Sequence, residues 1–461
     1  MNHTSRTFVL VGIVVFLLLI MHQLPTLTVA GVELRHVNVL SDLLPEYEES
    51  SQSVIPAPKP PKPLVAVTRK GETVKFTEQW SKGVEPIVDY SGGANGGMDH
   101  FYQMLASVNK LNRPVRIAYF GDSFIEGDIL SGDLRSMFQE SFGGYGVGWV
   151  DCSNPTTSFR RTVNQKSLGF QEFAVVKKPF DKSRQGIAQR YYTVSEGAQV
   201  WTSGTKIAHC ANWDVAKLFF RTPSPASITA QLNSGSSQQY PVGGATHVQT
   251  IETRGRATTV NYQFHHVDSR FTAFGMSLES ERGVILDNFS MRGSSGITLA
   301  NVPVVTLAEF ARLRPYDLII LHFGLNVAVS GNPEPVLQVY VNNMKKTIRN
   351  LHAAFPEASI LIVSVPDRDQ RSADGITTLK EVKNLVALQQ RLASECKVGF
   401  YNFYEAMGGE QSMKKLVDRN LANKDYTHLS FGGGRKVARK VFPSFNEGLN
   451  NYKRRKALEQ Q

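Results

Sequence analysis

Cysteine is scarce in this chain of 461 residues, which contains three. Cys152, Cys210 and Cys396 are too few for a disulfide framework, and they form no CxxC pair that would indicate a metal site. One disulfide, between Cys152 and Cys210, is possible if the protein lies in an oxidising compartment. A small domain held together by several disulfides is therefore excluded, and the fold must depend on its hydrophobic cores.

Acidic residues are fewer than basic ones: 40 Asp and Glu face 51 Lys and Arg, which gives a formal net charge of +11. No finger, RRM or homeodomain pattern accompanies this charge, so nucleic acid is not an expected partner. HExxH and similar metal-ligand spacings are also missing. The charge is either a solvated basic surface or an attraction for anionic polymer or a membrane surface, and the basic tail Lys453–Lys456 fits both interpretations.

A long hydrophobic span is the third feature that is lacking. The apolar run Phe8–Met21 is shorter than the roughly 20 residues that cross a bilayer. Arg6 precedes it, Pro25 follows it, and Thr28-Val29-Ala30 resembles a cleavage site with small residues. Residues 1–30 are therefore predicted to be a signal peptide or an uncleaved signal anchor.

Residues 31–97 are predicted to be a linker, which includes a Pro-rich spacer within Ser50–Leu64. Such a stiff, extended spacer suits a catalytic domain held off a membrane, and equally a tail on a secreted protein. We expect an exported protein, periplasmic or extracellular, with membrane or envelope association as an open alternative.

Hydrophobic patterning of one kind appears on both sides of the middle of the chain. Val115–Phe120 is an apolar run and Tyr316–Phe323 is a near-continuous one, as expected of parallel strands covered on both faces. Such runs alternate with amphipathic helical patterns, for example over Val336–Leu351. The alternation predicts an α/β domain with a doubly wound parallel sheet.

Patterning of a second kind interrupts this domain. Helical periodicity is lost over residues 150–281, where short β-rich runs alternate with polar turns. This pattern predicts an inserted β-sandwich or jelly-roll-like domain, with Trp201 and Trp213 in its core rather than serving as sugar platforms. The α/β domain is therefore predicted in two parts, residues 98–149 and 282–461.

Polar residues with complementary chemistry follow the predicted strands or lie in loops beside them. Ser123 ends the first strand, Asn326 follows the Tyr316–Phe323 strand, and Asp425 and His428 precede a terminal helix expected from about Gly434. Open α/β sheets place their chemistry at the carboxyl edge. A serine nucleophile needs a histidine base, the base needs an orienting carboxylate, and the tetrahedral intermediate needs hydrogen-bond donors such as the Asn amide.

In this order, the motifs resemble the conserved blocks of the SGNH or GDSL-type serine hydrolases. The first block is matched by Gly121-Asp122-Ser123, the third by Gly324-Leu325-Asn326, and the fifth by Asp425 and His428. Phe124 stands where leucine is frequent. Val327 replaces the usual acid after the Asn, a departure that questions the support of that loop.

The second block of this family contributes a glycine backbone N–H. Gly293 is the candidate here, with Gly296 close enough to be an alternative. The phrases GDSFIEGDILSGDLR, FGGYGVGW and ERGVILDNFSMRGSSG are similar to bacterial envelope esterases of the peptidoglycan O-acetylesterase type. Those enzymes carry a β-sandwich resembling a carbohydrate-binding module at the position of the insert.

The resemblance implies that Ser123 attacks an acetyl ester on a glycan, while His428 acts as base and then acid and Asp425 orients it. The oxyanion hole would consist of the Ser123 and Gly293 N–H groups and the Asn326 amide. Asp122 is expected to stabilise the turn, and no metal or cofactor is implied. An O-acetyltransferase with the same triad and a non-catalytic glycan-binding protein are the alternatives.

Overall fold

The computed structural model describes residues 63–461 except 95, 154, 373 and 374, together with positions 9, 28–29, 32–33, 58 and 60–61. Residues 1–56 and 57–461 form two separate units. In the first, β1 (Thr28–Val29) pairs with β2 (Val32–Glu33). The predicted signal segment Phe8–Met21 lies outside the described residues apart from Val9. Within the described part of the chain, no helix is both long and apolar enough to cross a membrane.

The second unit contains a six-stranded sheet in the order β16-β6-β17-β18-β21-β5. Its strands are parallel except for β5, which runs antiparallel to β21. Every residue of β6, β17 and β18 is buried, as expected of parallel strands covered on both faces. The strand bounds are β5 Ile87–Asp89, β6 Val115–Gly121, β16 Val284–Ser290, β17 Leu318–His322, β18 Ser359–Val363 and β21 Gly399–Tyr401.

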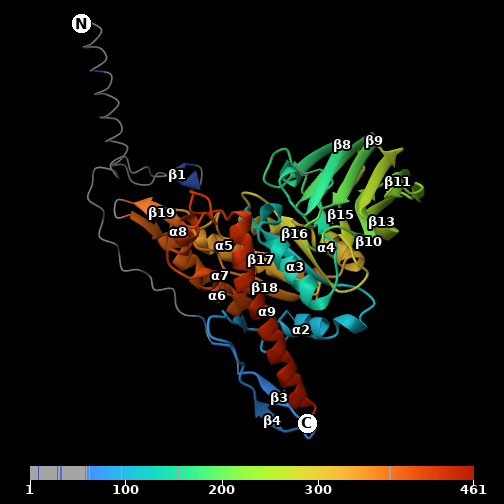
Figure 1. Cartoon of the computed structure of the whole chain (residues 1–461). Helices are drawn as coiled ribbons and strands as arrows, with labels where there is room; N and C mark the ends of the chain where they lie inside the picture. The colour runs from blue at the N-terminus through green and yellow to red at the C-terminus, as the bar shows by residue number, and fades with distance from the viewer. Residues whose placement is uncertain are drawn as a thin grey trace. The chain divides into compact units, whose positions relative to one another are not determined.

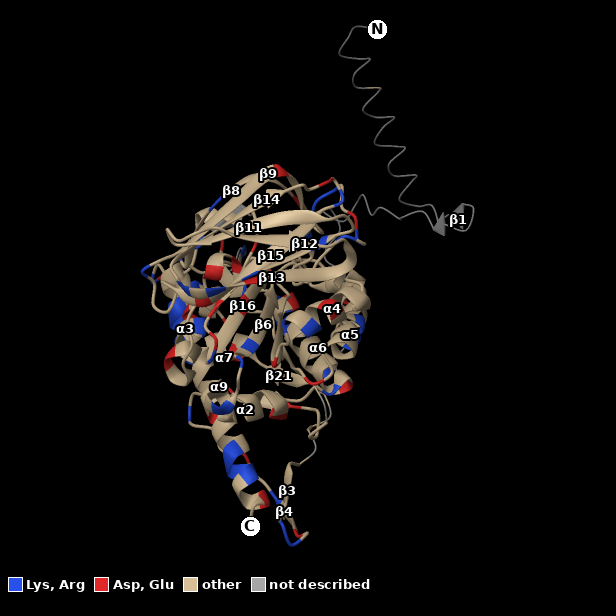
Figure 2. Cartoon of the chain, turned by 90° about the vertical axis from the view of Figure 1, so that its right-hand side faces the viewer, with Lys and Arg blue, Asp and Glu red and all other residues tan. Residues whose placement is uncertain are grey.

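Helices cover both faces of this sheet, as Figure 2 shows, with α4, α5 and α6 on one side and α3, α7 and α9 on the other. The doubly wound arrangement predicted from the sequence is therefore present. The terminal helix begins at Phe431, three residues before the expected Gly434. The helix bounds are α2 Asp99–Ala106, α3 Ser131–Phe142, α4 Val304–Leu313, α5 Glu334–Ala354, α6 Lys380–Cys396, α7 Phe403–Met407, α8 Ser412–Val417 and α9 Phe431–Glu459.

The β-rich region lies between α3 and β16 in the chain (Figure 1). Its nine strands join in one antiparallel sheet, in the order β12-β11-β14-β9-β15-β10-β13, with β7 beside β15 and β8 beside β9. Because hydrogen bonds connect all nine strands in a single sheet, the jelly-roll arrangement is not confirmed. The bounds are β7 Gly148–Val150, β8 Val163–Ala174, β9 Arg190–Gly204, β10 Trp213–Thr222, β11 Ala226–Leu232, β12 Gln238–Val242, β13 Ala245–Ala257, β14 Thr259–His265 and β15 Thr272–Glu279.

The core of the β-rich region contains two of the three cysteines and one of the two tryptophans considered above. Trp213 is fully buried there, as predicted, whereas Trp201 is 37% exposed, so its placement in the core was wrong. Trp201 lies on β9 at a position whose side chain points away from the core, in the alternation that strands impose. Cys152 and Cys210 are both buried as free thiols, so the bridge left open above is absent.

A buried ion-pair network joins the β-rich region to the α/β region. Glu279 ends β15 and binds Arg116 of β6 at 2.8 Å and Arg314, after α4, at 2.7 Å. Arg314 also binds Asp287 of β16 at 2.6 Å. Burial alone would raise the pKa of Glu279, but the two guanidinium groups lower it well below its usual range. The Glu279 carboxylate therefore stays charged, and this network of ion pairs fixes the two regions to each other.

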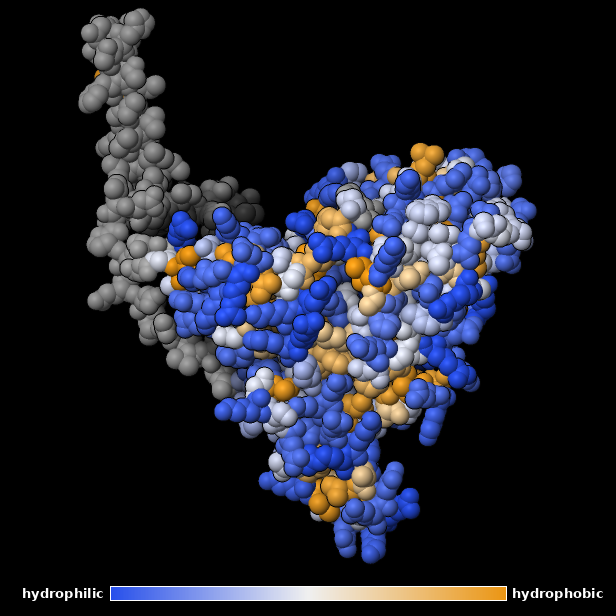
Figure 3. Space-filling model, viewed as in Figure 1, coloured by the Kyte–Doolittle hydropathy of each residue, from blue (hydrophilic) through white to orange (hydrophobic). Residues whose placement is uncertain are grey.

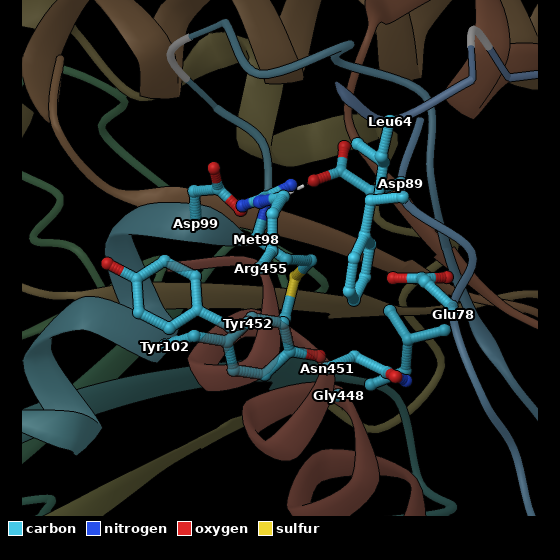
Figure 4. Close-up of a pocket in the computed structure, with 12 residues that line it drawn as sticks. Leu64, Glu78, Asp89, Met98, Asp99, Tyr102, Gly448, Asn451, Tyr452 and Arg455 are labelled. Carbon is cyan, nitrogen blue, oxygen red and sulfur yellow. Dashed lines mark hydrogen bonds and ion pairs between the residues drawn. The ribbon is translucent and has the colours of Figure 1, made fainter. Parts of the chain in front are cut away.

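The amino-terminal part of the second unit packs along the end of α9. The backbone of Gln79 exchanges two hydrogen bonds of 2.9 Å with the Asn451 side chain, and Arg455 forms an ion pair with Asp99 of α2. Figure 4 shows the small pocket that these segments line, with Arg455 beside Asp99. The hairpin of β3 (Val65–Val67) and β4 (Thr73–Lys75) precedes this contact. These contacts involve elements that do not carry the predicted catalytic residues.

Candidate active site

The predicted catalytic residues gather at the carboxyl edge of the six-stranded sheet because three strands end there in register. Gly121 of β6 is paired with Ser290 of β16 on one side and with His322 of β17 on the other. The loops that follow these strands carry Ser123, Gly293 and Asn326. Residues from three distant parts of the chain thus meet at one edge, as expected of an open α/β sheet.

Ser123, His428 and Asp425 form a continuous hydrogen-bonded chain. The Ser123 Oγ lies 2.7 Å from Nε2 of His428, and Nδ1 of His428 lies 2.8 Å from Oδ2 of Asp425. An ionised carboxylate can only accept hydrogen bonds, so Nδ1 carries the imidazole proton and Nε2 presents its lone pair to the serine hydroxyl. This is the tautomer that a general base needs in order to take the serine proton.

The loop that presents Asp425 and His428 is ordered by its own hydrogen bonds. Oδ1 of Asp425 accepts the backbone N–H groups of Thr427 and His428 at 2.9 and 3.1 Å. Burial tends to raise the pKa of Asp425, but the hydrogen bonds from His428 and Thr427 outweigh it and lower the pKa below its usual value. Asp425 is therefore ionised near neutral pH and can stabilise an imidazolium.

The two glycines considered for the oxyanion hole differ in their surroundings. Gly293 is exposed, has a φ of +77°, and has no atom within 4 Å of the position of a Cβ. Gly296 is buried against Phe323, and its N–H already donates to the Ser294 hydroxyl at 3.0 Å. Gly293 is thus the glycine with open space in front of it.

Asn326 lies next to the Gly293 loop. Its Nδ2 donates one hydrogen bond to the Ser294 carbonyl at 2.9 Å, which orients the amide and leaves the second N–H of that nitrogen for a ligand. The side chain is exposed at the mouth of the site. Asn326 and Gly293 are therefore held by the same short segment.

The loop around Val327 has an unexpected source of support. Val327 is buried, and the guanidinium of Arg368, which follows β18, donates to the carbonyls of Leu325 and Ala328 at 2.9 and 3.2 Å. Arg368 holds a loop in which the usual acid is missing. Sequence reasoning missed this residue, because no local pattern links an arginine after one strand to the carbonyls after another.

Asp122 is buried beside the nucleophile and accepts the Phe124 N–H at 2.9 Å. Burial raises its pKa to about 6, although the Phe124, Leu325 and Gly324 N–H groups and the charge of His428 act in the opposite direction. Asp122 thus connects the nucleophile turn to the Asn326 loop, in agreement with the expected stabilising role.

Buried charge behind the nucleophile was also not foreseen. Asp128, in the turn after Ser123, accepts hydrogen bonds from Arg135 at 2.7 Å and from Arg160 at 2.9 Å, the second of which lies beyond β7. Glu126 is buried in the same turn and forms an ion pair with Arg292, the neighbour of Gly293. These contacts fix the nucleophile turn relative to the β-rich region and to the second block. Among the described residues, no group of three or more His, Cys, Asp or Glu side chains could hold a metal ion.

Comparisons with known proteins concern the sequence family and the fold. Residues 253–431 match the GDSL-like lipase/acylhydrolase family. The fold is similar to a solved structure described as a peptidoglycan O-acetylesterase in action, with a TM-score of 0.67, 21% identity, and coverage of 79% of this chain and 99% of that one.

A family two carbohydrate esterase from Cellvibrio japonicus also matches, with 10% identity and coverage of 63% of this chain and 99% of that one. Its TM-score of 0.25 is too low to support an inference. No curated protein sequence matches the chain. The match over residues 253–431 and the shared fold agree with the resemblance of the sequence motifs to the SGNH or GDSL-type serine hydrolases.

Proposed function

We propose that this protein is a serine esterase that removes O-acetyl groups from peptidoglycan or another polysaccharide of the cell envelope. The observation that carries the proposal is the hydrogen-bonded chain from Ser123 through His428 to Asp425. Similarity to the fold of a peptidoglycan O-acetylesterase supports the choice of an acetylated glycan as substrate.

The first half of the proposed reaction forms an acyl-enzyme. Nε2 of His428 takes the proton of Ser123 while Oγ attacks the acetyl carbonyl, and the N–H groups of Ser123 and Gly293 with the Asn326 amide stabilise the oxyanion. The tetrahedral intermediate collapses as His428 returns the proton to the sugar oxygen, which leaves as a free hydroxyl. The acetyl group then remains on Oγ of Ser123.

In the second half, His428 removes a proton from water and the resulting hydroxide attacks the acetyl carbonyl. The bond to Oγ then breaks, His428 returns the proton to Ser123, and acetate is released. The side chains of His428 and Asp425 are 31% and 48% exposed, so bulk water reaches the base directly. This exposure favours hydrolysis over transfer to a sugar hydroxyl, because a transferase must keep water from the acyl-enzyme.

The test uses the purified protein and 4-nitrophenyl acetate, a small substrate that needs no glycan site. Ser123→Ala or His428→Ala should lower kcat by several orders of magnitude. Ser237→Ala and His247→Ala are matched controls, because both residues are exposed in the β-rich region, and these variants should retain full activity. Wild-type turnover in Ser123→Ala would refute the assignment of the nucleophile.

A second measurement supplies an O-acetylated glycan together with a non-acetylated acceptor. Release of free acetate with an unmodified acceptor supports the esterase, whereas acetyl groups on the acceptor would identify a transferase. Binding without turnover of any acetyl ester would identify a glycan-binding protein.

The proposed location is outside the cytoplasm, periplasmic or extracellular. The proposal depends on the apolar run Phe8–Met21 and the cleavage-like Thr28-Val29-Ala30. Fusion of residues 1–64 to a reporter that is active only after export would test it, with a matched fusion from which residues 8–21 are deleted.

A further inference from the structure

A pocket of about 380 Å³ lies where α3, the start of α9 and the loop after β9 approach one another. Figure 1 shows α3 and α9 beside each other in the α/β region, and the face drawn in Figure 3 is largely hydrophilic, with apolar side chains in small separate groups. We call this the basic pocket, because four of its lining residues are Arg161, Lys206, Arg435 and Arg439.

Three of these four cations have no carboxylate partner in the part of the chain that the structure describes. Arg435 binds Asp133 at 3.0 Å, and the other acid of the pocket, Asp128, is already occupied by Arg135 and Arg160. The other three cations are Arg161, Lys206 and Arg439, and their side chains are exposed. Among the described residues, none of these three forms an ion pair.

The guanidinium of Arg161 is held in place rather than free in solvent. It stacks over the Phe431 ring at 3.9 Å from the ring centroid. Stacking of this kind restricts the orientation of the planar group, whose N–H donors can still bind another partner. A preoriented guanidinium with two further cations around one cavity is suited to an anion, because like charges repel until a counter-charge arrives.

The basic pocket adjoins the catalytic residues through two segments. Phe431 follows His428 by three residues, so their Cα atoms are at most about 11 Å apart. Asp128, a buried residue that lines the pocket, belongs to the turn that begins at Ser123. A polymer whose acetyl group reaches Ser123 can therefore present a neighbouring unit to this pocket.

We propose that the basic pocket binds an anionic group, a carboxylate or a phosphate, carried on the polymer chain whose acetyl ester is cleaved at Ser123. The inference rests on the proposed esterase function and narrows its substrate to acidic glycans. It also gives part of the net charge of +11 a specific role.

The test compares wild type with the triple variant Arg161→Gln, Lys206→Gln and Arg439→Gln. Release of acetate from O-acetylated xylan, a neutral polymer, is measured in the presence of non-acetylated polygalacturonate as the carboxylate probe or poly(glycerol phosphate) as the phosphate probe. In the wild type, at least one probe should inhibit, and rising salt should weaken the inhibition.

In the triple variant, the inhibition constant of that probe should rise about tenfold, which corresponds to three modest ion pairs. Hydrolysis of O-acetylated xylan without a probe should change less than about twofold.

A control of equal net charge is the variant Lys70→Gln, Lys82→Gln and Lys346→Gln, whose exposed residues lie outside the pocket, and it should be inhibited like wild type. The double variant Lys206→Gln and Arg439→Gln leaves Arg161 over Phe431, and so it tests the charges without disturbing the segment after His428. The probe that loses affinity in the triple variant identifies the anion as carboxylate or phosphate.

Two results would overturn the proposed anion site: no inhibition of the wild type by either probe, or equal inhibition of the triple and control variants. If instead the wild type hydrolyses neither 4-nitrophenyl acetate nor O-acetylated xylan, the proposed esterase function fails. In that case, fluorescence anisotropy of the two labelled probes measures their binding to the wild type and to the triple variant. This measurement still decides whether the anion site exists.

Discussion

The buried carboxyl of Asp122 makes a quantitative prediction about stability. Its pKa rises from an ordinary value of 3.8 to about 6 because burial disfavours the charged form. A group whose folded pKa is raised contributes stability that is fully present below the unfolded pKa and is lost as pH rises through the folded value. Each pKa unit corresponds to about 1.4 kcal/mol. As the pH rises from about 4 to about 8, the ionisation of Asp122 therefore lowers the free energy of unfolding by about 3 kcal/mol.

Asp122→Asn removes this titration with almost no change of shape. The measurement is the free energy of unfolding from urea titrations of wild type and variant at several pH values. The stability of the variant minus that of the wild type should increase by about 3 kcal/mol from about pH 4 to about pH 8. Taking the difference cancels the titration of shared groups that do not interact with Asp122.

Asp181→Asn is a control of opposite sign. Hydrogen bonds from Ser183 lower the pKa of Asp181, so the wild-type residue contributes stability above its unfolded pKa and loses it as pH falls. The corresponding difference for this variant should therefore decrease with rising pH. A difference for Asp122→Asn that does not depend on pH would refute the assignment of a raised pKa to a buried, ionising carboxyl.

Two further predictions concern the oxyanion side and the packing of α9. Asn326→Ala should lower kcat about 10²- to 10³-fold with little effect on KM, since the amide acts on charge that develops in the transition state; an unchanged kcat would exclude Asn326 from that role. Gly434→Ala places a Cβ 1.7 Å from the Ile129 carbonyl oxygen and should lower the free energy of unfolding by about 3 kcal/mol. The control is Gly243→Ala, whose Cβ has no atom within 4 Å, and it should change that free energy by less than about 0.5 kcal/mol. Equal melting temperatures of the two glycine variants would contradict the close approach of α9 to the nucleophile turn.

Local sequence patterns were sufficient for most of the α/β region. The predicted runs that became β6 and β17 form strands in which every residue is buried, and a mostly apolar stretch of this kind favours a parallel strand. The helical repeat of Leu337, Val341, Met344 and Ile348 likewise specified the buried face of α5.

Local patterns were less informative in the β-rich region. The alternation of short strands was recognised, but strand pairing depends on segments far apart in the chain, so the single nine-stranded sheet was not foreseen. The same reason explains Trp201, since the side of the strand that faces solvent is decided by what packs on the other side.

The sequence by itself determined which chemical groups are available: a serine after a buried strand, an amide after another, and an aspartate three residues before a histidine. Their types and spacing are local properties, and they sufficed to predict Ser123, Asn326, Asp425 and His428 as one site. Only the tertiary structure decided that Arg368 supports the Val327 loop and that four cations line one pocket beside the site. Such contacts join segments whose separation in the chain carries no repeating pattern, so they exist only once the sheet and its helices have packed.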